Sequence, residues 1–334
     1  MACEDKGREP VPVDAEPTVP SPFRSPADCE RIVAARDTPS RGALKVGTWN
    51  IRWFPRGQAS SGGTGTDIEW LACLIDHLEV DVLAVQEFIQ DHQGRNATIN
   101  LLERLGARTG SRWSSAFDDC PDDDRQHVGV LWNESRVAIE TVRTVAEMNP
   151  LSGPCASRLR PAIDAYVEPR QGPDLHLVVV HFDSGVQRRD RDNRLVSVER
   201  TTSILPAIME RPGDRDLLLV GDFNTMGCVQ CSPRQSATEE LEQVTAGLGV
   251  GRAPLQRIAP NHRCTEYYRR NPVALDHAFV SRALGDSARP VANVYGPCAE
   301  LACGRLKGYE SYEATISDHC PIVIELGAPG APPP

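Results

Sequence analysis

Short apolar runs that end at a polar residue constrain the fold of this chain more than any other feature of its sequence. The runs are rich in Val, Ile and Leu, which is typical of buried strands. A single polar strand end carries little information, because such a residue is usually a cap or part of a turn. Six runs in this chain end in this way, at Asn50, Glu87, His181, Asp222, Asp276 and Asp318–His319. The sequence therefore predicts a site built from strand ends on one rim of a sheet.

Strands and helices are expected to alternate over residues 44–326 without a linker-like break, which indicates one domain. Period and composition predict strands over 45–50, 82–86, 128–132, 162–167, 175–181, 217–222, 274–280 and 322–325. Apolar residues at helical spacing predict helices over 67–78, 96–109, 191–209 and 236–247. The alternation alone would also suit a parallel, doubly wound sheet.

The two ends of the chain differ in composition from this domain. Residues 1–43 hold seven prolines and no periodic apolar pattern, which predicts a flexible N-terminal segment that Cys29 could pin to the domain. Residues 327–334 form a second Pro-rich tail. Residues 57–66, 118–126 and 295–312 are predicted to be loops.

The net charge is −10, from 36 Lys and Arg against 46 Asp and Glu. This balance argues against a protein that coats nucleic acid by charge alone, since that mode needs a basic surface. It does not argue against an enzyme that touches phosphates at one focused site. The sequence has no apolar run of about 18 residues, so no membrane-spanning helix is expected.

Eleven cysteines are many for a cytosolic enzyme of this size. Several, such as Cys120 and Cys155, lie in polar loops with Pro or Gly nearby, which predicts disulfides and an oxidising compartment. The protein is therefore expected to be secreted, periplasmic or surface-anchored. Cys228 and Cys231 could form half of a zinc site, but no second CxxC or HxxxH partners them. One disulfide, or two that leave the same loop, is favoured.

Cys3 follows Met1-Ala2 and precedes polar residues, as in a processed bacterial lipoprotein, so it is expected to carry a lipid anchor. That would leave ten cysteines and allow five pairs. Cys73 and Cys320 fall in a predicted helix and next to a predicted strand, so their pairing stays open.

Two motifs carry a family resemblance: Gly221-Asp222-Phe223-Asn224 and Ser317-Asp318-His319. With the other strand ends, they make the chain from Trp49 to Glu325 resemble the endonuclease/exonuclease/phosphatase (DNase I-like) superfamily. His181-Phe-Asp-Ser-Gly is similar to a motif of secreted bacterial members. The resemblance implies a four-layer α/β sandwich, with two packed, mainly antiparallel sheets flanked by helices. It also implies an active site where the loops at one sheet edge converge.

The resemblance assigns roles to the strand-end residues. Asn50, Glu87 and Asp318 would hold Mg²⁺, with Mn²⁺ or Ca²⁺ as alternatives, because a hard cation suits few carboxylates plus water and phosphate oxygens. For Glu87 the alternative is an exposed strand-end acid. His319 would activate water, and Asp276 would hold its imidazole.

The remaining site residues would act on the phosphate. His181 would serve as an acid or hold the phosphate, and Asn224 would donate to a phosphoryl oxygen. The role of Asp222 stays open between orienting water and passing on a proton. Arg160 and Arg188 are phosphate candidates, although a solvated helix start explains an arginine such as Arg188 at least as well.

Together these features predict a metal-dependent phosphodiesterase, favoured as a nuclease that hydrolyses DNA by direct attack of water. The protein is expected to be a monomer. One rival is the same chemistry on a lipid such as sphingomyelin or on a small phosphoester. Residues 272–277 lack the Trp-Cys-Asp-Arg core of inositol-polyphosphate phosphatases, which disfavours phosphoinositides. The second rival is a binding protein on an inactive enzyme fold, and the full residue set argues against it.

Overall fold

The structure is a computed structural model that describes residues 20–36, 42–57, 64–121, 124–151, 155, 159–210 and 214–327. The helices are α1 (Pro26–Ala34), α2 (Ile68–Leu78), α3 (His92–Thr109), α4 (Arg188–Met209), α5 (Ala237–Leu248), α6 (Arg282–Ala288), α7 (Pro297–Glu300) and α8 (Glu310–Thr315), with a 3₁₀ turn η2 (Ala146–Met148). The strands are β1 (Leu44–Phe54), β2 (Val82–Ile89), β3 (Trp113–Phe117), β4 (Gln126–Asn133), β5 (Val137–Val145), β6 (Ala162–Pro169), β7 (Leu175–His181), β8 (Leu217–Asp222), β9 (Leu255–Ile258), β10 (Glu266–Tyr268), β11 (Asn271–Val273), β12 (Asp276–Ser281), β13 (Val291–Val294) and β14 (Ile322–Leu326).

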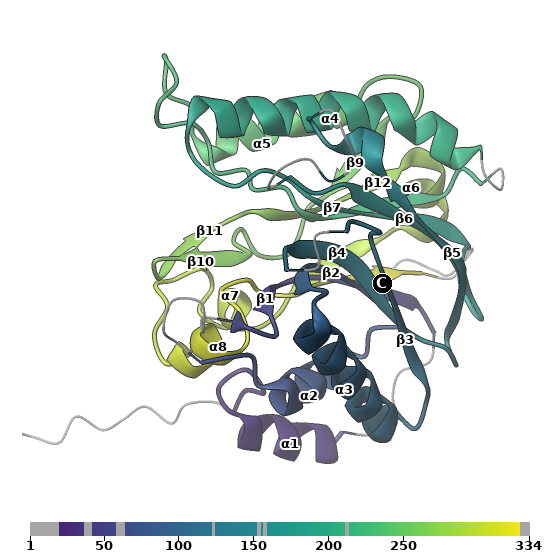
Figure 1. The fold of residues 1–334 in the computed structure, drawn as a ribbon, viewed down its shortest axis with the longest axis vertical. Coiled ribbons are helices and arrows are strands. Elements are labelled where there is room, and N and C mark those ends of the chain that lie inside the picture. The colour runs from purple at the N-terminus through teal and green to yellow at the C-terminus, as the bar shows by residue number, and fades with distance from the viewer. Residues whose placement is uncertain are drawn as a thin grey trace, which may run out of the picture.

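Two six-stranded sheets face each other across the middle of the molecule (Figure 1). Sheet A has the order β13-β14-β1-β2-β4-β3, and sheet B has the order β5-β6-β7-β8-β12-β9. Only β1–β2 and β7–β8 pair in parallel; the other neighbours pair antiparallel. The mainly antiparallel pairing confirms the predicted sandwich and rules out a doubly wound parallel sheet.

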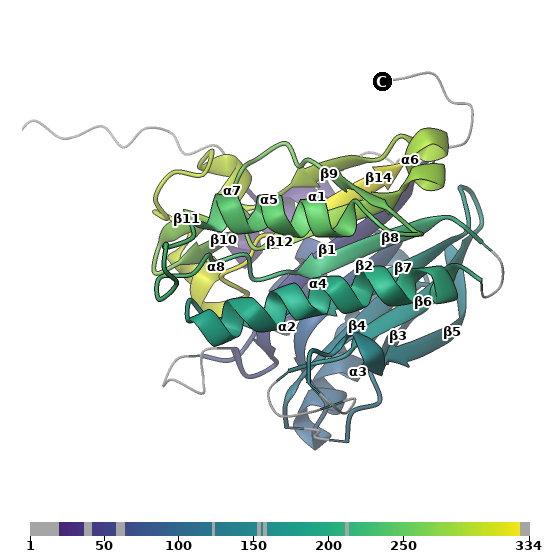
Figure 2. The same ribbon diagram turned by 90° about the horizontal axis from the view of Figure 1, so that it is seen from above.

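Helices cover the outer face of each sheet, which makes four layers. Helices α1, α2 and α3 lie outside sheet A, and α4 and α5 lie outside sheet B (Figures 1 and 2). Successive side chains of β7 point to opposite faces of sheet B and pack into two different cores. Leu177 and Val179 pack between the sheets, whereas Val178 and Val180 pack under α4 and α5. A strand buried on both faces explains why β7 reads as one continuous apolar run.

Helix α1 lies within the N-terminal segment predicted to be flexible. Ser25 caps the helix by accepting from the Asp28 N–H, and Pro26 occupies its first turn. Cys29 is fully buried and forms a disulfide with Cys73 of α2. Phe23 packs edge-on against His77. The segment is ordered by these long-range contacts, which local composition cannot show. Residues 1–19 and 328–334 lie outside the described residues.

The edge strands and the C-terminal helices were also not predicted. The predicted loop over 295–312 contains α7 and the start of α8. Strand β5 lies at the edge of sheet B, and its outward side chains are polar and exposed, so it lacks the continuous apolar run that marks a central strand. The central strands, by contrast, were predicted within a few residues.

Ten cysteines form five disulfides: Cys29–Cys73, Cys120–Cys155, Cys228–Cys231, Cys264–Cys303 and Cys298–Cys320. The predicted pairing within the Cys228–Cys231 loop is therefore confirmed. Cys3, the predicted lipid-anchor residue, lies outside the described residues. Disulfides of this number are typical of an oxidising environment. None of the described helices is long and apolar enough to span a membrane.

Candidate active site

Three neighbouring strands of sheet B bring His181, Asp222 and Asp276 into one row. His181 pairs in register with Asp222 across β7 and β8, and Asp222 pairs with Asp276 across β8 and β12. Residues in register on adjacent strands point to the same face of a sheet. The Nε2 atom of His181 lies 3.4 Å from Oδ2 of Asp222. These three predicted residues are therefore brought together by strand pairing itself.

Gly221 makes the close pairing of β7 and β8 possible. Its φ is +140°, and a Cβ at this position would lie 2.0 Å from the Val180 carbonyl oxygen. Only glycine fits such a position. The glycine of the Gly-Asp-Phe-Asn motif thus fixes the place of Asp222, one residue later.

Asn50 and Glu87 reach the same point from sheet A. Asn50 Nδ2 donates to Asp222 Oδ2 at 3.0 Å and to Glu87 Oε1 at 3.2 Å, which links the two sheets. The register of β2 shifts between Gln86 and Phe88, and Glu87 has φ +66°. A bulge of this kind turns a side chain to a new direction. Left-handed backbone at Glu87, and also at Trp53 and Asn224, concentrates strain around the site.

His319 forms a hydrogen-bonded pair with Asp276. Its Nδ1 lies 2.8 Å from Asp276 Oδ2, and its Nε2 lies 3.9 Å from Asp222 Oδ2. The backbone carbonyl of His319 accepts from Trp49 Nε1 and from the Tyr312 hydroxyl. Because the backbone is held on two sides, the imidazole has a fixed position and presents Nε2 to the site.

The electrostatics of the cluster are those of several acids buried together. Burial raises the pKa of Asp222 to about 7, with His319 opposing the shift and Asp276 adding to it. Burial and then the charge of Asp318 raise the pKa of Glu87. Burial works against the charged form of His319, but Asp276 and the other acids outweigh it and raise its pKa well above the usual value. Negative charge is therefore in excess here.

This donor set fits a hard divalent cation. Asn50 Oδ1 and Asp276 Oδ1 are buried acceptors with no hydrogen-bond partner in the described part of the chain. Asp222, Asp276 and His319 can each place one ligand atom within 4.8 Å of the others. The chemistry of the set, carboxylate and amide oxygens with one imidazole, suits Mg²⁺ or Mn²⁺. Because Nδ1 of His319 is hydrogen-bonded to Asp276, fewer atoms of these three residues are available to bind a cation.

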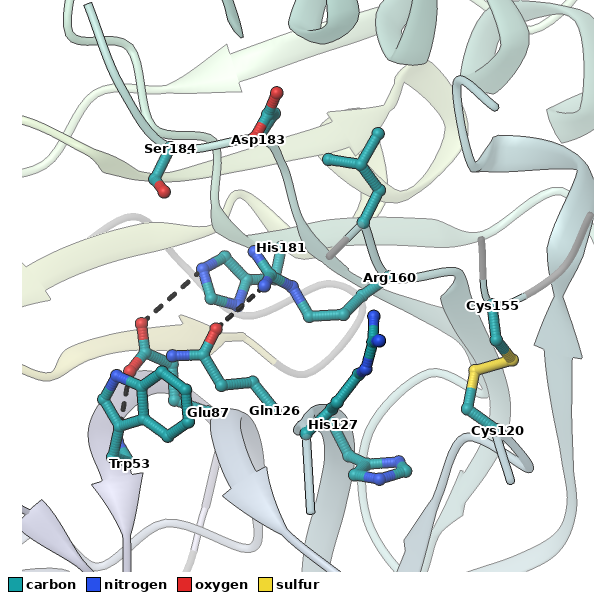
Figure 3. Close-up of a pocket in the computed structure, with 12 residues that line it drawn as sticks. Trp53, Glu87, Cys120, Gln126, His127, Cys155, Arg160, His181, Asp183 and Ser184 are labelled. Carbon is teal, nitrogen blue, oxygen red and sulfur yellow. Dashed lines mark hydrogen bonds and ion pairs between the residues drawn. A yellow bond between two sulfur atoms is a disulfide. The ribbon is translucent and has the colours of Figure 1, made fainter. Parts of the chain in front are cut away.

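A cavity of about 570 Å³ opens beside the cluster (Figure 3). Arg160 lies along it, and its Nη1 donates to Gln126 Oε1 at 2.8 Å. Trp53 stands at its rim with 37% of its surface exposed, and its backbone N–H donates to Glu87 Oε2 at 3.1 Å. The Cys120–Cys155 disulfide forms part of the wall. The cavity thus joins a guanidinium, an exposed indole and the acidic cluster.

The structure brings the other predicted residues to the site in different degrees. Asn224 is 4% exposed; its backbone N–H donates to Asp222 Oδ1, and its side-chain amide donates to the Phe182 carbonyl. Asp318 is paired with Arg52 at 3.2 Å and is close enough to Glu87 to raise its pKa. Arg188 is exposed at the first position of α4 and does not line the cavity.

Arg194, which also lies on α4, has a structural role. Arg194 is fully buried and pairs with Glu240 at 2.8 Å. It also donates to the carbonyls of Asp183 and Gly185, in the turn that follows His181. Arg194 therefore holds the shape of the His181-Phe-Asp-Ser-Gly segment from behind.

Glu266 and Gln126 are parts of the site that sequence reasoning missed. Glu266 is 5% exposed and forms an isolated β-bridge with His319. Burial raises its pKa to about 8. Strand β10, which carries it, has only three residues, so no apolar run marked it. Gln126 is the last residue of the predicted loop over 118–126. Only its hydrogen bond with Arg160 shows that it belongs to the site.

Comparisons with known proteins identify the fold. No protein-family model and no curated protein match the chain by sequence. The endonuclease/exonuclease/phosphatase from Bacteroides vulgatus is 14% identical, with 86% of this chain and 100% of that chain covered and a TM-score of 0.57.

Two further solved structures are similar. D. rerio TDP2, in complex with a single-strand DNA product, is 16% identical over 86% of this chain and 100% of its own, with a TM-score of 0.56. The human Nocturnin catalytic domain with a bound sulfate is 17% identical over 89% and 98%, with a TM-score of 0.53. The chain thus has the fold of the endonuclease/exonuclease/phosphatase structures, which confirms the predicted resemblance and fold class.

Proposed function

We propose that this chain, which has the DNase I-like fold, is a metal-dependent phosphodiesterase that hydrolyses DNA. The observation that carries the proposal is the convergence of Asn50, Glu87, Asp222 and the His319–Asp276 pair at one rim of the two sheets. Such a cluster is costly, because buried acids destabilise one another. A strained, acid-rich site of this kind is explained by function better than by folding.

In the proposed reaction, His319 Nε2 accepts a proton from water as the water oxygen attacks phosphorus. The ester bond to the leaving oxygen breaks, and that oxygen takes up a proton. Asp276 acts as a positioning residue, since its bond to Nδ1 keeps Nε2 as the acceptor and supports the imidazolium. Arg160 and Asn224 would contact the phosphoryl oxygens. His181 and Asp222 lie between these groups, where either could pass on a proton.

Asn50, Glu87 and Asp318 are the proposed ligands of a divalent cation, Mg²⁺ in the first place. When bound, the cation would supply charge stabilisation for the phosphoryl and leaving oxygens. The same positive charge would offset the acids that raise the pKa of His319 and so favour its neutral form.

The five disulfides support a compartment that is oxidising, and we propose that the protein acts outside the cytosol. Anchoring through Cys3 and a monomeric state stay predictions.

A substrate panel tests the proposed function. Supercoiled plasmid, linear duplex, single strand, abasic duplex and a sphingomyelin-type ester are incubated with the protein and Mg²⁺. We expect cleavage of DNA that EDTA abolishes and that His319→Ala reduces by about 10²–10⁴-fold. Cleavage of the lipid ester alone would refute the DNA substrate. Full activity of His319→Ala would refute the mechanism.

A small phosphodiester is the second candidate substrate, and the cavity favours it. At about 570 Å³ the cavity could enclose one substituent of a compact ester, next to Arg160 and Trp53. A polymeric substrate would instead lie across the opening of the cavity. Turnover of a soluble small diester that excess DNA does not inhibit would favour this candidate.

A further inference from the structure

A second cavity, of about 640 Å³, lies on the outer face of sheet B and is separate from the acidic cluster. It is lined by the first turn of α5, by the segment after β9 and by the end of β11, which lie together at one end of the molecule (Figure 2). Three of the described residues that line it are basic or can become so (Arg257, His262 and Arg263), and none is acidic.

Arg257 is the feature that needs an explanation. It sits on β9 opposite Phe279 of β12, and Phe279 packs in the core under α4 and α5. Its side chain therefore faces α5. Its Nε is buried and has no hydrogen-bond partner, and the described part of the chain gives its guanidinium no ion pair. Burial lowers its pKa. A partly buried guanidinium that has no ion pair in the described part of the chain is available to bind an anion.

The rest of the cavity suits an anion with an apolar or planar body. Ala237 and Thr238 belong to the first turn of α5, where backbone N–H groups carry the positive end of the helix dipole. Both acids of this turn are engaged elsewhere: Glu239 forms a capping box with Ser236, and Glu240 pairs with Arg194. Leu241 and Val273 give apolar walls. A guanidinium matches the geometry of phosphate oxygens.

We propose that this cavity, the Arg257 cavity, binds the phosphate group of a nucleotide. The nucleotide could be a unit of a nucleic-acid strand that also occupies the catalytic cluster, or a free nucleotide. If the ligand is a strand that also occupies the catalytic cluster, the inference rests on the proposed function. If the ligand is a free nucleotide, the inference does not depend on it. Ala274, which lines the cavity, lies two residues before Asp276, so the cavity and the catalytic cluster lie near the same end of β12.

Binding measured in EDTA, where no metal-dependent cleavage takes place, tests the inference. The probes are adenosine 5′-monophosphate, followed by calorimetry, and a fluorescein-labelled single-stranded oligodeoxynucleotide, followed by anisotropy. We expect Arg257→Gln to weaken binding of the monophosphate about tenfold, as the loss of one charged contact would. Arg143→Gln, an exposed arginine on β5 at the other edge of sheet B, is the control and should bind as the wild type does.

The oligonucleotide distinguishes the two sources of the phosphate group, a nucleic-acid strand and a free nucleotide. If a strand occupies the cavity, Arg257→Gln weakens its binding too and lowers the slope of log affinity against log salt by about one. If only the monophosphate is affected, the ligand is a free nucleotide. Wild-type affinity of Arg257→Gln for both probes, or no binding of either probe by the wild type, would overturn the proposal.

The stability of the variant separates binding from folding. Arg257→Gln should unfold at the wild-type Tm or above it, because it removes an unpaired charge. Arg257→Lys, which keeps the charge, should retain part of the affinity. Equal loss of affinity in both variants, with a lowered Tm in both, would assign Arg257 a structural role and contradict the inference. Since all of these readouts are made without turnover, they stand even if the chain cleaves no nucleic acid.

Discussion

At the scale of single residues, the site depends on a few side chains whose positions are set by backbone geometry. Asp222 is the centre: Asn50 donates to it from sheet A, the Asn224 backbone N–H donates to it from its own turn, and His181 lies beside it. A side chain with so many partners cannot change without moving the others. The residues around it therefore act as one unit, and single substitutions are expected to be non-additive.

The positioning role of Asp276 can be measured separately from chemistry. Asp276→Asn keeps the size of the side chain but removes the charge that supports the imidazolium of His319. We expect kcat to fall by about 10²–10⁴-fold while KM changes little, because Asp276 acts through His319 and not on the substrate. His92→Ala, an exposed histidine at the start of α3, is the matched control and should keep wild-type kinetics. A rise in KM with unchanged kcat would contradict a positioning role.

Residue types and strand ends were enough to predict most of the cluster, since Asn50, Glu87, Asp222, Asp276 and His319 do meet. What the sequence could not show is how they meet. The bulge at Glu87 arises where β2 pairs with β4, which lies far from it in the chain, and Asn224 adopts a left-handed backbone in the turn after β8. Glu266 had no signal in the sequence, because its contact with the site is a bridge to His319, 53 residues away in the chain.

At the scale of elements, disulfides tie the catalytic segment to its surroundings. Cys320 follows His319 directly and is bonded to Cys298 of α7, 22 residues away in sequence. Removing this bond frees a long loop in the unfolded chain, which costs about 3 kcal/mol of stability by the loop-closure relation. The bond also fixes the residue next to the catalytic imidazole.

We therefore expect the double variant Cys298→Ala/Cys320→Ala to lose about 3 kcal/mol in urea unfolding and most of its activity. The matched control is Cys228→Ala/Cys231→Ala, whose bond spans a separation of only 3 residues. By the same relation it should lose about half as much. Equal losses in the two double variants would contradict the dependence on loop length.

Helix α2 carries a group that makes the docking of the N-terminal segment sensitive to pH. His77 packs against Phe23, and burial, followed by the charge of Arg36, lowers its pKa. The unfolded chain therefore binds a proton below about pH 6.5 that the folded chain binds only at lower pH. Stability rises with pH in this window and is lost as pH falls through it.

The expected result is that the wild type loses more free energy of unfolding between about pH 7 and about pH 5 than His77→Gln does. The difference is at most about 1.4 kcal/mol per pH unit, the value for one proton. Urea unfolding at the two pH values measures it. Equal pH dependence in the two proteins would show that the shift at His77 does not affect folding.

Elements were predicted best where both faces are buried. The predicted limits of β7 and β8 agree with the structure, because their apolar runs are unbroken and end in His181 and Asp222. Helix α1 was missed because its order comes from Cys29 and Phe23 packing on α2, which is a tertiary effect. Short pieces such as β10 and α7 carry too few residues for any period to emerge.

At the scale of the whole molecule, the distribution of charge matters more than its sum. Acids converge at the rim of the two sheets, whereas the Arg257 cavity has no acid among its described lining residues. The net charge of −10 opposes non-specific binding of a polyanion over the whole surface. Binding is then expected to be local, through a cation and a few arginines, and to weaken only modestly with salt.

The proposed reaction depends on Glu87, which helps to hold the cation. It is tested most directly by the rate of plasmid cleavage as a function of Mg²⁺ concentration, in the wild type and in Glu87→Gln. We expect no cleavage in EDTA, saturation of the wild type with Mg²⁺, and a rate for Glu87→Gln at least about 100-fold lower, because a neutral amide replaces the carboxylate ligand. Cleavage in EDTA, or the same Mg²⁺ dependence in both proteins, would contradict it.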